Sequence, residues 1–413
     1  MTNTTHDARE FDIIIQGATG FTGTLVAEYL LKTYGVNNEL RWALAGRSEE
    51  KLRQVRDALG AEAKGLEIIV ADSFDDDALQ SLASRTRVVL TTVGPYALYG
   101  SNLVAACVEA GTHYCDLAGE VQWIRKMVDT HHERAQQTGA KIVHCCGFDS
   151  IPMDIGVWAL QDAVQTKYGS FCESISMLVK ATKGTASGGT LASMMNLIKE
   201  SREDRNVARI LIHPYSLNPE GEREGPDERD QQNVVFSEEV NAWTAPFVMA
   251  GVNTKIVRRS HALAGYPYGK DFRYSEAVMT GRGFSGWMGG TAMQLGLGGI
   301  VLLAAFSPTR KLLQRFVLAK PGEGPDREMQ ESGFFNLMQV GELADGTIVH
   351  GKITGDRDPG YGSTSKMLSE SAVCLAKDKL PEGGGVLTPA AAMARPLLKR
   401  LREKAGLSFE LLD

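Results

Sequence analysis

The first 150 residues alternate between short apolar runs and longer stretches with helical spacing. Apolar runs that predict strands lie at 11–16, 40–45, 66–71, 87–92, 113–116 and 141–144. Helical spacing follows residue 20 to about Tyr34 and recurs near 49–59, 75–84, 100–110 and 121–138. Short buried strands that alternate with helices are typical of a doubly wound parallel sheet. We therefore predict an α/β domain over residues 1–150.

The pattern changes after residue 150. Strands are expected at 174–180 and 272–279, and two more, 336–343 and 347–354, flank the hairpin signal Ala344-Asp345-Gly346. Helices are expected from Pro152 to about Gln165 and over 190–201. This mixture predicts an α+β second domain over 151–380 with a mostly antiparallel sheet. We expect this domain to serve substrate binding or dimerisation.

The last part of the chain, 381–413, has the signals of a single capped helix. Thr388 is placed as its N-cap, Pro389 as its first residue, and Gly406 lies beyond its end. We expect this helix to pack on the first domain.

A glycine-rich turn follows the first predicted strand. In such a turn the first glycine allows a tight bend, the second lets a pyrophosphate approach the backbone, and the third lets the helix pack closely. The free N–H groups and positive dipole end of the next helix suit a phosphate. We predict a Rossmann-type dinucleotide site here, built from Gly17, Thr19, Gly20, Phe21, Thr22 and Gly23.

The end of the second predicted strand bears on the choice of cofactor. A fold selective for NAD usually has an acid here, which binds the ribose 2′-hydroxyl. This chain has Arg47 and Ser48 instead, with Lys51 one turn later. A guanidinium and a hydroxyl suit a 2′-phosphate, so we predict NADP(H). The alternative is a solvated turn that only caps the next helix.

Ligands of open α/β sheets lie outside the carboxyl ends of the strands. Asp72 ends the third strand and is placed to reach the adenine, or else to cap the helix at 75. Val93, Gly94 and Pro95 follow the fourth strand, where a backbone turn can pack against the nicotinamide ribose. These residues complete the predicted cofactor site.

Three residues are candidates for catalysis: Tyr96, Asp149 and Ser150. Tyr96 can stack on the nicotinamide or donate a proton, or it is simply a packed loop tyrosine. Asp149 and Ser150 lie in the turn that leads into the second domain, so their position favours the ligand cleft. Asp149 can alternatively be the N-cap of the next helix. No Ser/His/Asp triad can be argued from the chain.

Composition excludes several classes of protein. The 413 residues exceed one ordinary core, and 43% hydrophobic with 23% charged residues is typical of a globular protein. A net charge of −6 and the lack of a basic, aromatic stripe argue against nucleic acid as a partner. The six cysteines form no C-x-x-C motif or metal-site spacing. This spacing predicts no metal site. The polar, acid-containing N-terminus resembles no signal peptide, so we expect a cytoplasmic protein.

Residues 283–309 carry no charged side chain and include the apolar run 295–306. Three interpretations stay open: a buried or interface helix within the second domain, an element that contacts a membrane surface or an acyl chain, and a membrane span. A span needs about 20 apolar residues, and the many glycines here count against it. The basic residues Lys311, Arg315 and Lys320 that follow suit anionic headgroups or an exposed helix end.

Taken together, the motifs resemble those of the saccharopine dehydrogenase-like oxidoreductases. The motifs that carry this resemblance lie at strand ends: residues 17–23, 45–48, 92–96, 114–120 and 147–152. Further segments are similar to the mycobacterial trans-acting enoyl reductase branch: 187–190, 253–260, 320–325, 358–361 and 385–390.

The resemblance to that branch implies NADPH-dependent reduction of an enoyl double bond on a polyketide-type or lipid acyl chain, free or bound to a carrier. The saccharopine side of the family implies an imine reductase acting on amino acids, with Arg258, Arg259 and Arg273 as carboxylate-binding candidates. A third possibility is a lipid- or membrane-associated protein that retains the dinucleotide fold. A homodimer is compatible with each.

Overall fold

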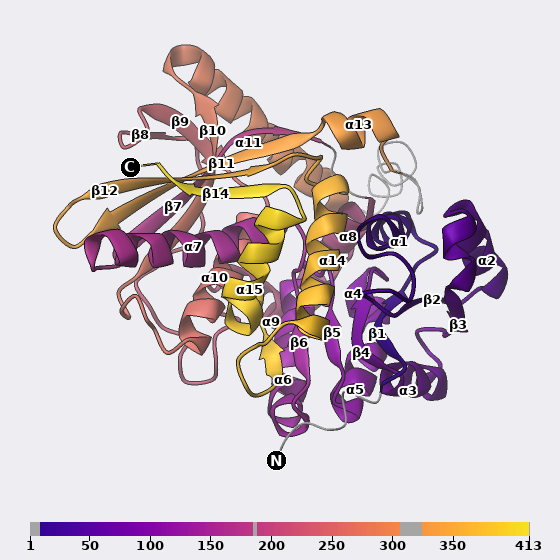
Figure 1. The fold of residues 1–413 in the computed structure, drawn as a ribbon. Coiled ribbons are helices and arrows are strands. Elements are labelled where there is room, and N and C mark those ends of the chain that lie inside the picture. Colours follow the sequence, from indigo (N-terminus) through magenta and orange to yellow (C-terminus); the bar gives the residue numbers. More distant parts are fainter. Residues whose placement is uncertain (1–8, 185–187, 306–323, 413) are drawn as a thin grey trace. The chain divides into compact units, whose positions relative to one another are not determined.

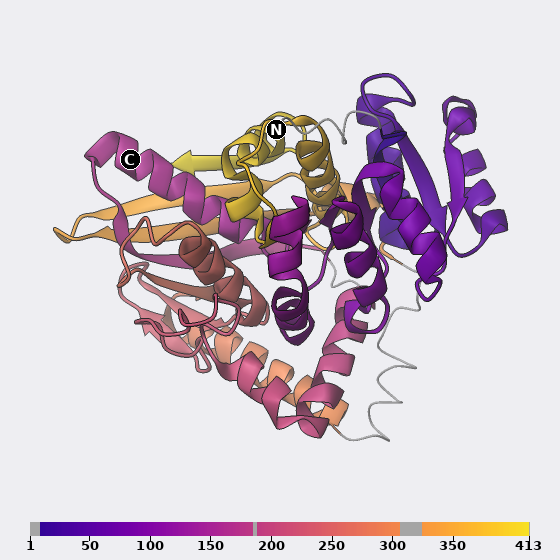
Figure 2. The ribbon, with the colours of Figure 1, turned by 90° about the horizontal axis from the view of Figure 1, so that it is seen from below.

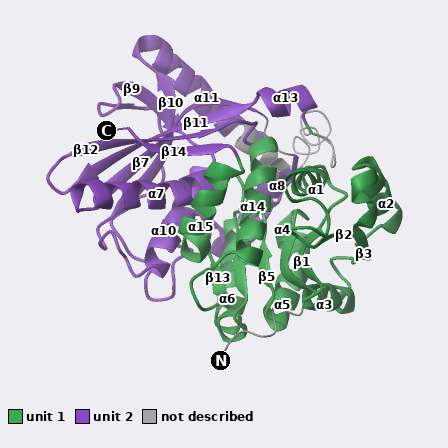
Figure 3. Ribbon diagram, viewed as in Figure 1, with its two compact units in different colours: residues 1–148, 321–324, 361–405 green, residues 149–320, 325–360, 406–413 purple. Residues whose placement is uncertain are grey.

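The computed structural model describes residues 9–184, 188–305 and 324–412, and these form two compact units (Figure 3). Unit 1 comprises 1–148, 321–324 and 361–405, and unit 2 comprises 149–320, 325–360 and 406–413. Each unit therefore combines segments that are distant in the sequence. The first change of unit, after Phe148, lies close to the domain boundary expected at 150.

Unit 1 is built on a seven-stranded sheet in which every neighbouring pair is parallel, in the order β13-β6-β5-β4-β1-β2-β3 (Figure 1). Its strands are β1 Phe11–Gln16, β2 Trp42–Gly46, β3 Glu67–Val70, β4 Thr86–Thr91, β5 His113–Cys115, β6 Lys141–Val143 and β13 Gly385–Leu387. The fully buried β1 is apolar at most positions because helices cover both faces of the sheet. The predicted doubly wound parallel sheet is confirmed.

The helices of unit 1 form two layers. They are α1 Phe21–Tyr34, α2 Glu49–Ala58, α3 Asp76–Ser84, α4 Tyr96–Tyr99, α5 Ser101–Ala110, α6 Val121–Thr138, α14 Gly362–Lys377, α15 Pro389–Glu403 and the short 3-10 helix Ala61–Gly65. Helix α5 packs against α3 and α6, and α14 packs against α1 and α15 (Figures 1 and 2). Right-handed crossovers account for α1 on one face of the sheet and for α3, α5 and α6 on the other. Helices α14 and α15 do not connect strands of this sheet and join the α1 layer by packing.

Helix α14 belongs to unit 1, although the sequence placed residues 361–377 in the second domain. Its Glu370 is buried and accepts hydrogen bonds from the hydroxyls of Tyr29 (2.7 Å) and Tyr34 (2.7 Å) on α1. Arg400 of α15 donates to the same carboxylate at 3.3 Å. A buried carboxylate needs such partners, and these come only from unit 1. The expected boundary at residue 380 is therefore wrong.

Unit 2 contains the second seven-stranded sheet, in the order β14-β12-β11-β7-β10-β9-β8. Its strands are β7 Cys172–Lys183, β8 Val235–Ser237, β9 Ala242–Pro246, β10 Arg273–Gly281, β11 Phe334–Leu343, β12 Ile348–Gly355 and β14 Leu407–Leu411. Only the β7–β10 pair among these described strands is parallel. The predicted antiparallel character and the β11–β12 hairpin are both confirmed, with Gly346 at φ +83° in the turn.

The end of the chain departs from the single helix expected over 381–413. Thr388 does cap α15, accepting from the N–H of Ala391 at 3.4 Å, and Gly406 has φ +74° beyond its end. Residues before and after this helix, however, form β13 in the first sheet and β14 in the second. Three and five residues are too few for a periodicity signal, so the sequence pattern did not predict these strands.

The helices of unit 2 are α7 Ile151–Tyr168, α8 Gly188–Glu203, α9 Arg205–Ile212, α10 Ala250–Leu263, α11 Gly283–Ala305 and α13 Arg327–Ser332. Helix α7 packs on β7, β12 and β14 and also contacts α10. The charged stretch 220–230 forms no helix or strand.

Helix α11 accounts for most of the uncharged segment 283–309; residues 306–309 lie outside the described residues. It packs against β9, β10 and α8 (Figure 2). Several of its large apolar side chains are nevertheless exposed, among them Phe284 (72%), Leu295 (70%) and Leu302 (63%). The described part of the segment is thus not a buried helix. Within the described ranges, no helix is long and apolar enough to cross a membrane.

Candidate cofactor and active site

The turn between β1 and α1 gives each glycine a different steric environment. Gly17 has φ +91°, and a Cβ there would stand 2.7 Å from Cγ2 of Val93. A Cβ on Gly23 would stand 2.2 Å from the carbonyl oxygen of Gly17, so only glycine allows this approach of helix and loop. Gly20 has an ordinary φ of −80° and room for a Cβ, whose nearest contact would be 3.4 Å away. Its lack of a side chain is therefore not required by the fold itself.

The N-terminus of α1 is available to an anion. Gly20 is its N-cap, and no side chain accepts a hydrogen bond from the first turn. Thr19, Phe21 and Thr22 are half-buried around this end of the helix, and the ring of Phe21 packs edge-on against Tyr361 at 4.9 Å. Unpaired helical N–H groups beside a glycine that presents bare backbone are what a pyrophosphate requires. The loop fits the phosphates of a dinucleotide.

Arg47 and Ser48 follow β2 and differ in their roles. The Ser48 hydroxyl accepts from the N–H of Lys51 at 3.4 Å, so Ser48 does cap α2. Arg47 is exposed, and its guanidinium has no hydrogen-bond or ion-pair partner among the described residues. Lys51 is exposed on the first turn of the same helix. The carboxyl end of β2 is therefore followed by two exposed cations, Arg47 and Lys51. The capping alternative explains Ser48 but neither of these cations.

The ends of β3 and β4 complete this edge. Asp72 is exposed and accepts from the N–H of Phe74 at 3.0 Å, whereas Asp75 caps α3. The capping alternative for Asp72 is therefore wrong. Val93 donates its N–H to Thr91 and leads into the cis Gly94–Pro95 bond. Because β4, β1, β2 and β3 are neighbours, the loops that carry all predicted cofactor residues lie side by side within unit 1.

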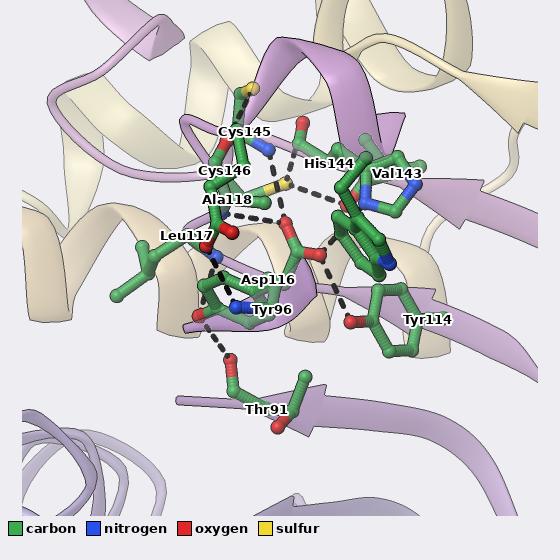
Figure 4. Close-up of polar contacts among 12 residues, drawn as sticks. Thr91, Tyr96, Tyr114, Asp116, Leu117, Ala118, Val143, His144, Cys145 and Cys146 are labelled. Atoms are coloured by element: carbon green, nitrogen blue, oxygen red, sulfur yellow. Dashed lines mark hydrogen bonds and ion pairs between the residues drawn. The ribbon is translucent and has the colours of Figure 1, made fainter. Parts of the chain in front are cut away.

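A buried carboxylate organises the neighbouring loops, as Figure 4 shows. Asp116 accepts hydrogen bonds from the Tyr114 hydroxyl at 2.9 Å and from the N–H groups of Ala118 (2.9 Å) and Cys145 (3.2 Å), and it lies 2.7 Å from Nδ1 of His144. This carboxylate thereby joins the chain after β5 to the chain after β6. Asp116 was not among the predicted site residues, although it ends the predicted strand 113–116 and ligands of such sheets lie at strand ends.

Tyr96 is held by the same region. Its hydroxyl donates to the carbonyl of Thr91 (3.3 Å) and accepts from the N–H of Leu117 (3.1 Å) (Figure 4). Its ring stacks on Trp123, and its N–H donates to the Glu120 carboxylate at 2.7 Å. Burial raises the pKa of Tyr96 well above its usual value. The structure favours the packed loop tyrosine over the predicted proton donor.

Asp149 and Ser150 begin unit 2. Ser150, not Asp149, is the N-cap residue of α7, so the capping alternative for Asp149 is wrong. The half-buried carboxyl of Asp149 has no hydrogen-bond partner among the described residues, and burial raises its pKa to about 7. The Ser150 hydroxyl is buried and donates to Oδ1 of Asn253 at 2.8 Å. Asp149 is thus the candidate whose proton is both unengaged and exchangeable near neutrality.

Two of the arginines considered for carboxylate binding are structural. Arg258 donates to Asp227 at 2.6 Å and to the carbonyls of Pro214 (3.2 Å) and Tyr274 (3.0 Å). Arg259 is buried and donates to the carbonyl of Leu217. Arg273 is exposed at the start of β10. The described residues contain no cluster of His, Cys, Asp and Glu that could hold a metal ion.

Nearly the whole chain is similar to proteins named as trans-acting enoyl reductases. A protein of Mycobacterium tuberculosis (strain H37Rv), provisionally given that name, is 41% identical over 97% of both chains. The trans-acting enoyl reductase of Mycobacterium leprae is 38% identical over 96% of both chains. The chain belongs to the trans-acting enoyl reductase family.

The family match also identifies the cofactor domain. A profile described as the saccharopine dehydrogenase NADP binding domain matches residues 13–143, which lie within unit 1. This member of the trans-acting enoyl reductase family is therefore a saccharopine dehydrogenase-like, NADP-binding oxidoreductase, and its cofactor is NADP(H). The predicted resemblance and cofactor are confirmed.

The fold of the family member is shared with a distant enzyme. Saccharopine dehydrogenase (L-Glu forming) from Saccharomyces cerevisiae superposes with a TM-score of 0.54 at 14% identity, covering 98% of this chain and all of that one. At this identity the likeness concerns the fold alone, and it confirms the predicted architecture.

Proposed function

We propose that the protein uses NADPH to reduce the carbon–carbon double bond of an enoyl group on a lipid or polyketide-type acyl substrate. The observation that carries this proposal is the 41% identity, across both units of the chain, to a protein provisionally named as a trans-acting enoyl reductase. A relation limited to the NADP domain would support only the cofactor, because fold and cofactor alone do not define a substrate.

The proposed cofactor residues come from four adjacent strand ends of unit 1. Residues 17–23 bind the pyrophosphate through backbone N–H groups and the N-terminus of α1. Arg47, Ser48 and Lys51 bind the 2′-phosphate, since the Ser48 oxygen caps α2 while its proton is free to donate. Asp72 lies toward the adenine, and Val93, Gly94 and Pro95 toward the nicotinamide ribose.

NADPH, when bound, supplies the hydride that the β-carbon of the enoyl group receives. The α-carbon then needs a proton from the protein, so that the double bond gains one hydride and one proton. We assign this proton to Asp149, since a carboxyl with a pKa of about 7 is protonated in part of the molecules at neutral pH. Phe148 donates its N–H to the Thr364 hydroxyl at 2.9 Å, which fixes the backbone just before Asp149.

The reaction can be tested by following NADPH absorbance after addition of enoyl thioesters of increasing chain length. We expect oxidation of NADPH that depends on the double bond, with the saturated thioester as the matched control. The result that contradicts the proposal is tight NADPH binding without turnover of any enoyl thioester.

The second candidate is a saccharopine-type imine reductase, which forms a secondary amine on an amino acid. Its substrate would bring carboxylates that need unengaged arginines. Arg258 and Arg259 are committed to Asp227 and to backbone carbonyls, which leaves Arg273 of the three candidates. NADPH oxidation with glutamate and an aldehyde-bearing partner, but not with enoyl thioesters, would favour this alternative.

Arg47→Ala is expected to weaken NADPH binding and to leave NADH binding nearly unchanged. Loss of a hydrogen bond between charged groups costs about 1.5–3 kcal/mol, which corresponds to a 10- to 150-fold higher Kd for NADPH. Fluorescence titration with both nucleotides measures this difference.

The matched control is Arg53→Ala, which removes an exposed arginine of α2 that is paired with Glu49. We expect this variant to bind both nucleotides like the parent chain. Equal losses of NADPH and NADH affinity in Arg47→Ala would contradict the assignment of the 2′-phosphate.

We also propose that helix α11 contacts lipid. Its exposed large side chains carry no charge, and the exposed Arg282 directly before the helix suits an anionic headgroup. The protein is expected to sediment with vesicles that contain anionic phospholipid, and Leu295→Glu with Leu302→Glu should abolish most of this binding. Ile348→Glu, at an exposed apolar position on β12, is the matched control. Failure of the parent chain to bind the vesicles would overturn this proposal.

A further inference from the structure

Helix α10 is buried around most of its circumference although it carries many polar residues. Asn253, Thr254, Lys255, Arg258, Arg259, Ser260 and His261 all lie in the interior. Burial of so many polar groups is costly unless each has a partner. Their partners therefore indicate what the helix holds in place.

Two of these side chains join α10 to the first turn of α7. The Ser150 hydroxyl donates to Oδ1 of Asn253 at 2.8 Å. The Ser260 hydroxyl, two turns further along α10, donates to the carboxylate of Asp154, which lies one turn beyond Ser150. Residues 150 and 154 share one face of α7, and residues 253 and 260 share one face of α10. The two contacts thus clamp the start of α7 at two successive turns.

The amide of Asn253 is itself oriented by Glu276 on β10. Its Nδ2 donates to Oε2 of Glu276 on β10 at 3.0 Å, and the Tyr274 hydroxyl donates to Oε1 of Glu276 at 2.9 Å. Glu276 is buried, which raises its pKa to about 8, so this carboxyl is largely neutral at pH 7. With Nδ2 of Asn253 directed at Glu276, Oδ1 of the same amide accepts the hydrogen bond from Ser150.

The backbone that this network holds is strained. Ser150 has φ +140°, a conformation that residues with a Cβ seldom adopt. Such strain persists only where the surroundings over-determine the conformation. The Ser150 side chain hydrogen-bonds to Asn253, and Asp149, the proposed acid, directly precedes Ser150 in the chain.

We propose that Asn253 is a positioning residue, which fixes Ser150 and through it the carboxyl of Asp149. The inference rests on the proposed role of Asp149 as the proton donor. It gives the buried Ser150 a role different from direct catalysis, because the Ser150 proton is already committed to Asn253. A small displacement of a reacting group can cost up to about 100-fold in rate.

The test compares variants of the full-length enzyme in the enoyl thioester assay. Asn253→Ala is expected to lower kcat by about 10- to 100-fold while KM and the Kd for NADPH change little. Ser150→Gly removes the same hydrogen bond, and glycine adopts φ +140° without strain. This second variant tests the proposal if Asn253→Ala does not fold. Glu276→Gln can still accept from Asn253 and should retain most of the parent kcat.

Ser260→Ala is the matched control for a merely structural role. It removes the second contact between α10 and α7, so we expect lower thermal stability with nearly unchanged kcat. If Ser260→Ala and Ser150→Gly lower kcat alike, the positioning role is refuted.

A double-mutant cycle separates failure of the inference from failure of the proposed function. If Asp149→Asn lowers kcat, Asn253→Ala should cause no further loss in that background, because the positioned group is gone. Independent, multiplicative losses would overturn the inference alone. Parent-like kcat in Asp149→Asn would instead overturn the role of Asp149, and the inference with it.

Discussion

Asp149→Asn is expected to lower kcat for enoyl reduction by about 10²- to 10⁴-fold, the usual contribution of a positioned acid. The substitution keeps the shape of the side chain and removes the proton that the α-carbon needs. NADPH binding should be unaffected, because the residues proposed for the cofactor lie at other strand ends. Steady-state kinetics together with NADPH titration measure both quantities.

The pH dependence gives a second readout for the same residue. The acid must be protonated to act, so kcat of the parent enzyme should fall as pH rises through about 7, the pKa of Asp149. The residual activity of Asp149→Asn should lack this decline. A parent-like rate or an unchanged pH profile in the variant would rule out Asp149 as the donor.

The raised pKa of Asp149 also affects stability. Between its ordinary value of 3.8 and about 7, the folded state keeps a proton that the unfolded state releases. The free energy of unfolding therefore contains a contribution that falls as pH rises across this interval. Asp149→Asn removes that contribution, so the variant should lose less stability than the parent between pH 5 and 8, as measured by urea unfolding.

Asp116→Ala is expected to lower the free energy of unfolding by about 3–5 kcal/mol, because each buried group left without a hydrogen-bond partner costs about 1–3 kcal/mol. The change leaves the Tyr114 hydroxyl and the N–H groups of Ala118 and Cys145 without an acceptor. It also leaves His144 without its carboxylate. Urea denaturation measures the loss, and Asp116→Asn, which retains one acceptor oxygen, should lie between parent and alanine variant.

Glu109→Ala provides the comparison for Asp116→Ala. Glu109 is 54% exposed and pairs with Arg134 on the surface of unit 1. Exposed ion pairs contribute little to stability, so this variant should unfold almost like the parent. A similarly small effect of Asp116→Ala would show that the loops after β5 and β6 are held by packing rather than by the carboxylate.

The predicted elements of unit 1 match the structure because their signals are local. Most of the parallel strands are short, buried and largely apolar. Gly17 and Gly23 meet the backbone requirements of one short turn. Arg47 and Ser48 could likewise be assigned from their position after β2. Signals of this kind depend on neighbours in the sequence, so the sequence alone could predict the doubly wound sheet and its cofactor.

Residues that act through distant partners could not be assigned in this way. Tyr96 binds Glu120, 24 residues away, and Asp116 contacts His144 and Cys145, 28 and 29 residues away. Ser150 binds Asn253, which is 103 residues away. From the sequence alone, Tyr96, Asp149 and Ser150 were equivalent candidates for catalysis. The structure distinguishes them by hydrogen bonding: two hydroxyls are engaged and one carboxyl is not.

The sequence by itself determined the fold class, the dinucleotide loop and the preference for NADP(H), because periodicity, glycine spacing and strand-end charge are local properties. Only the tertiary structure decided that α14 and β13 complete unit 1, that β14 joins the second sheet, and that α11 exposes apolar side chains. These outcomes depend on which surfaces become buried when distant segments meet. Burial also determines whether a polar side chain must be paired, and it leaves Asp149 as the candidate acid.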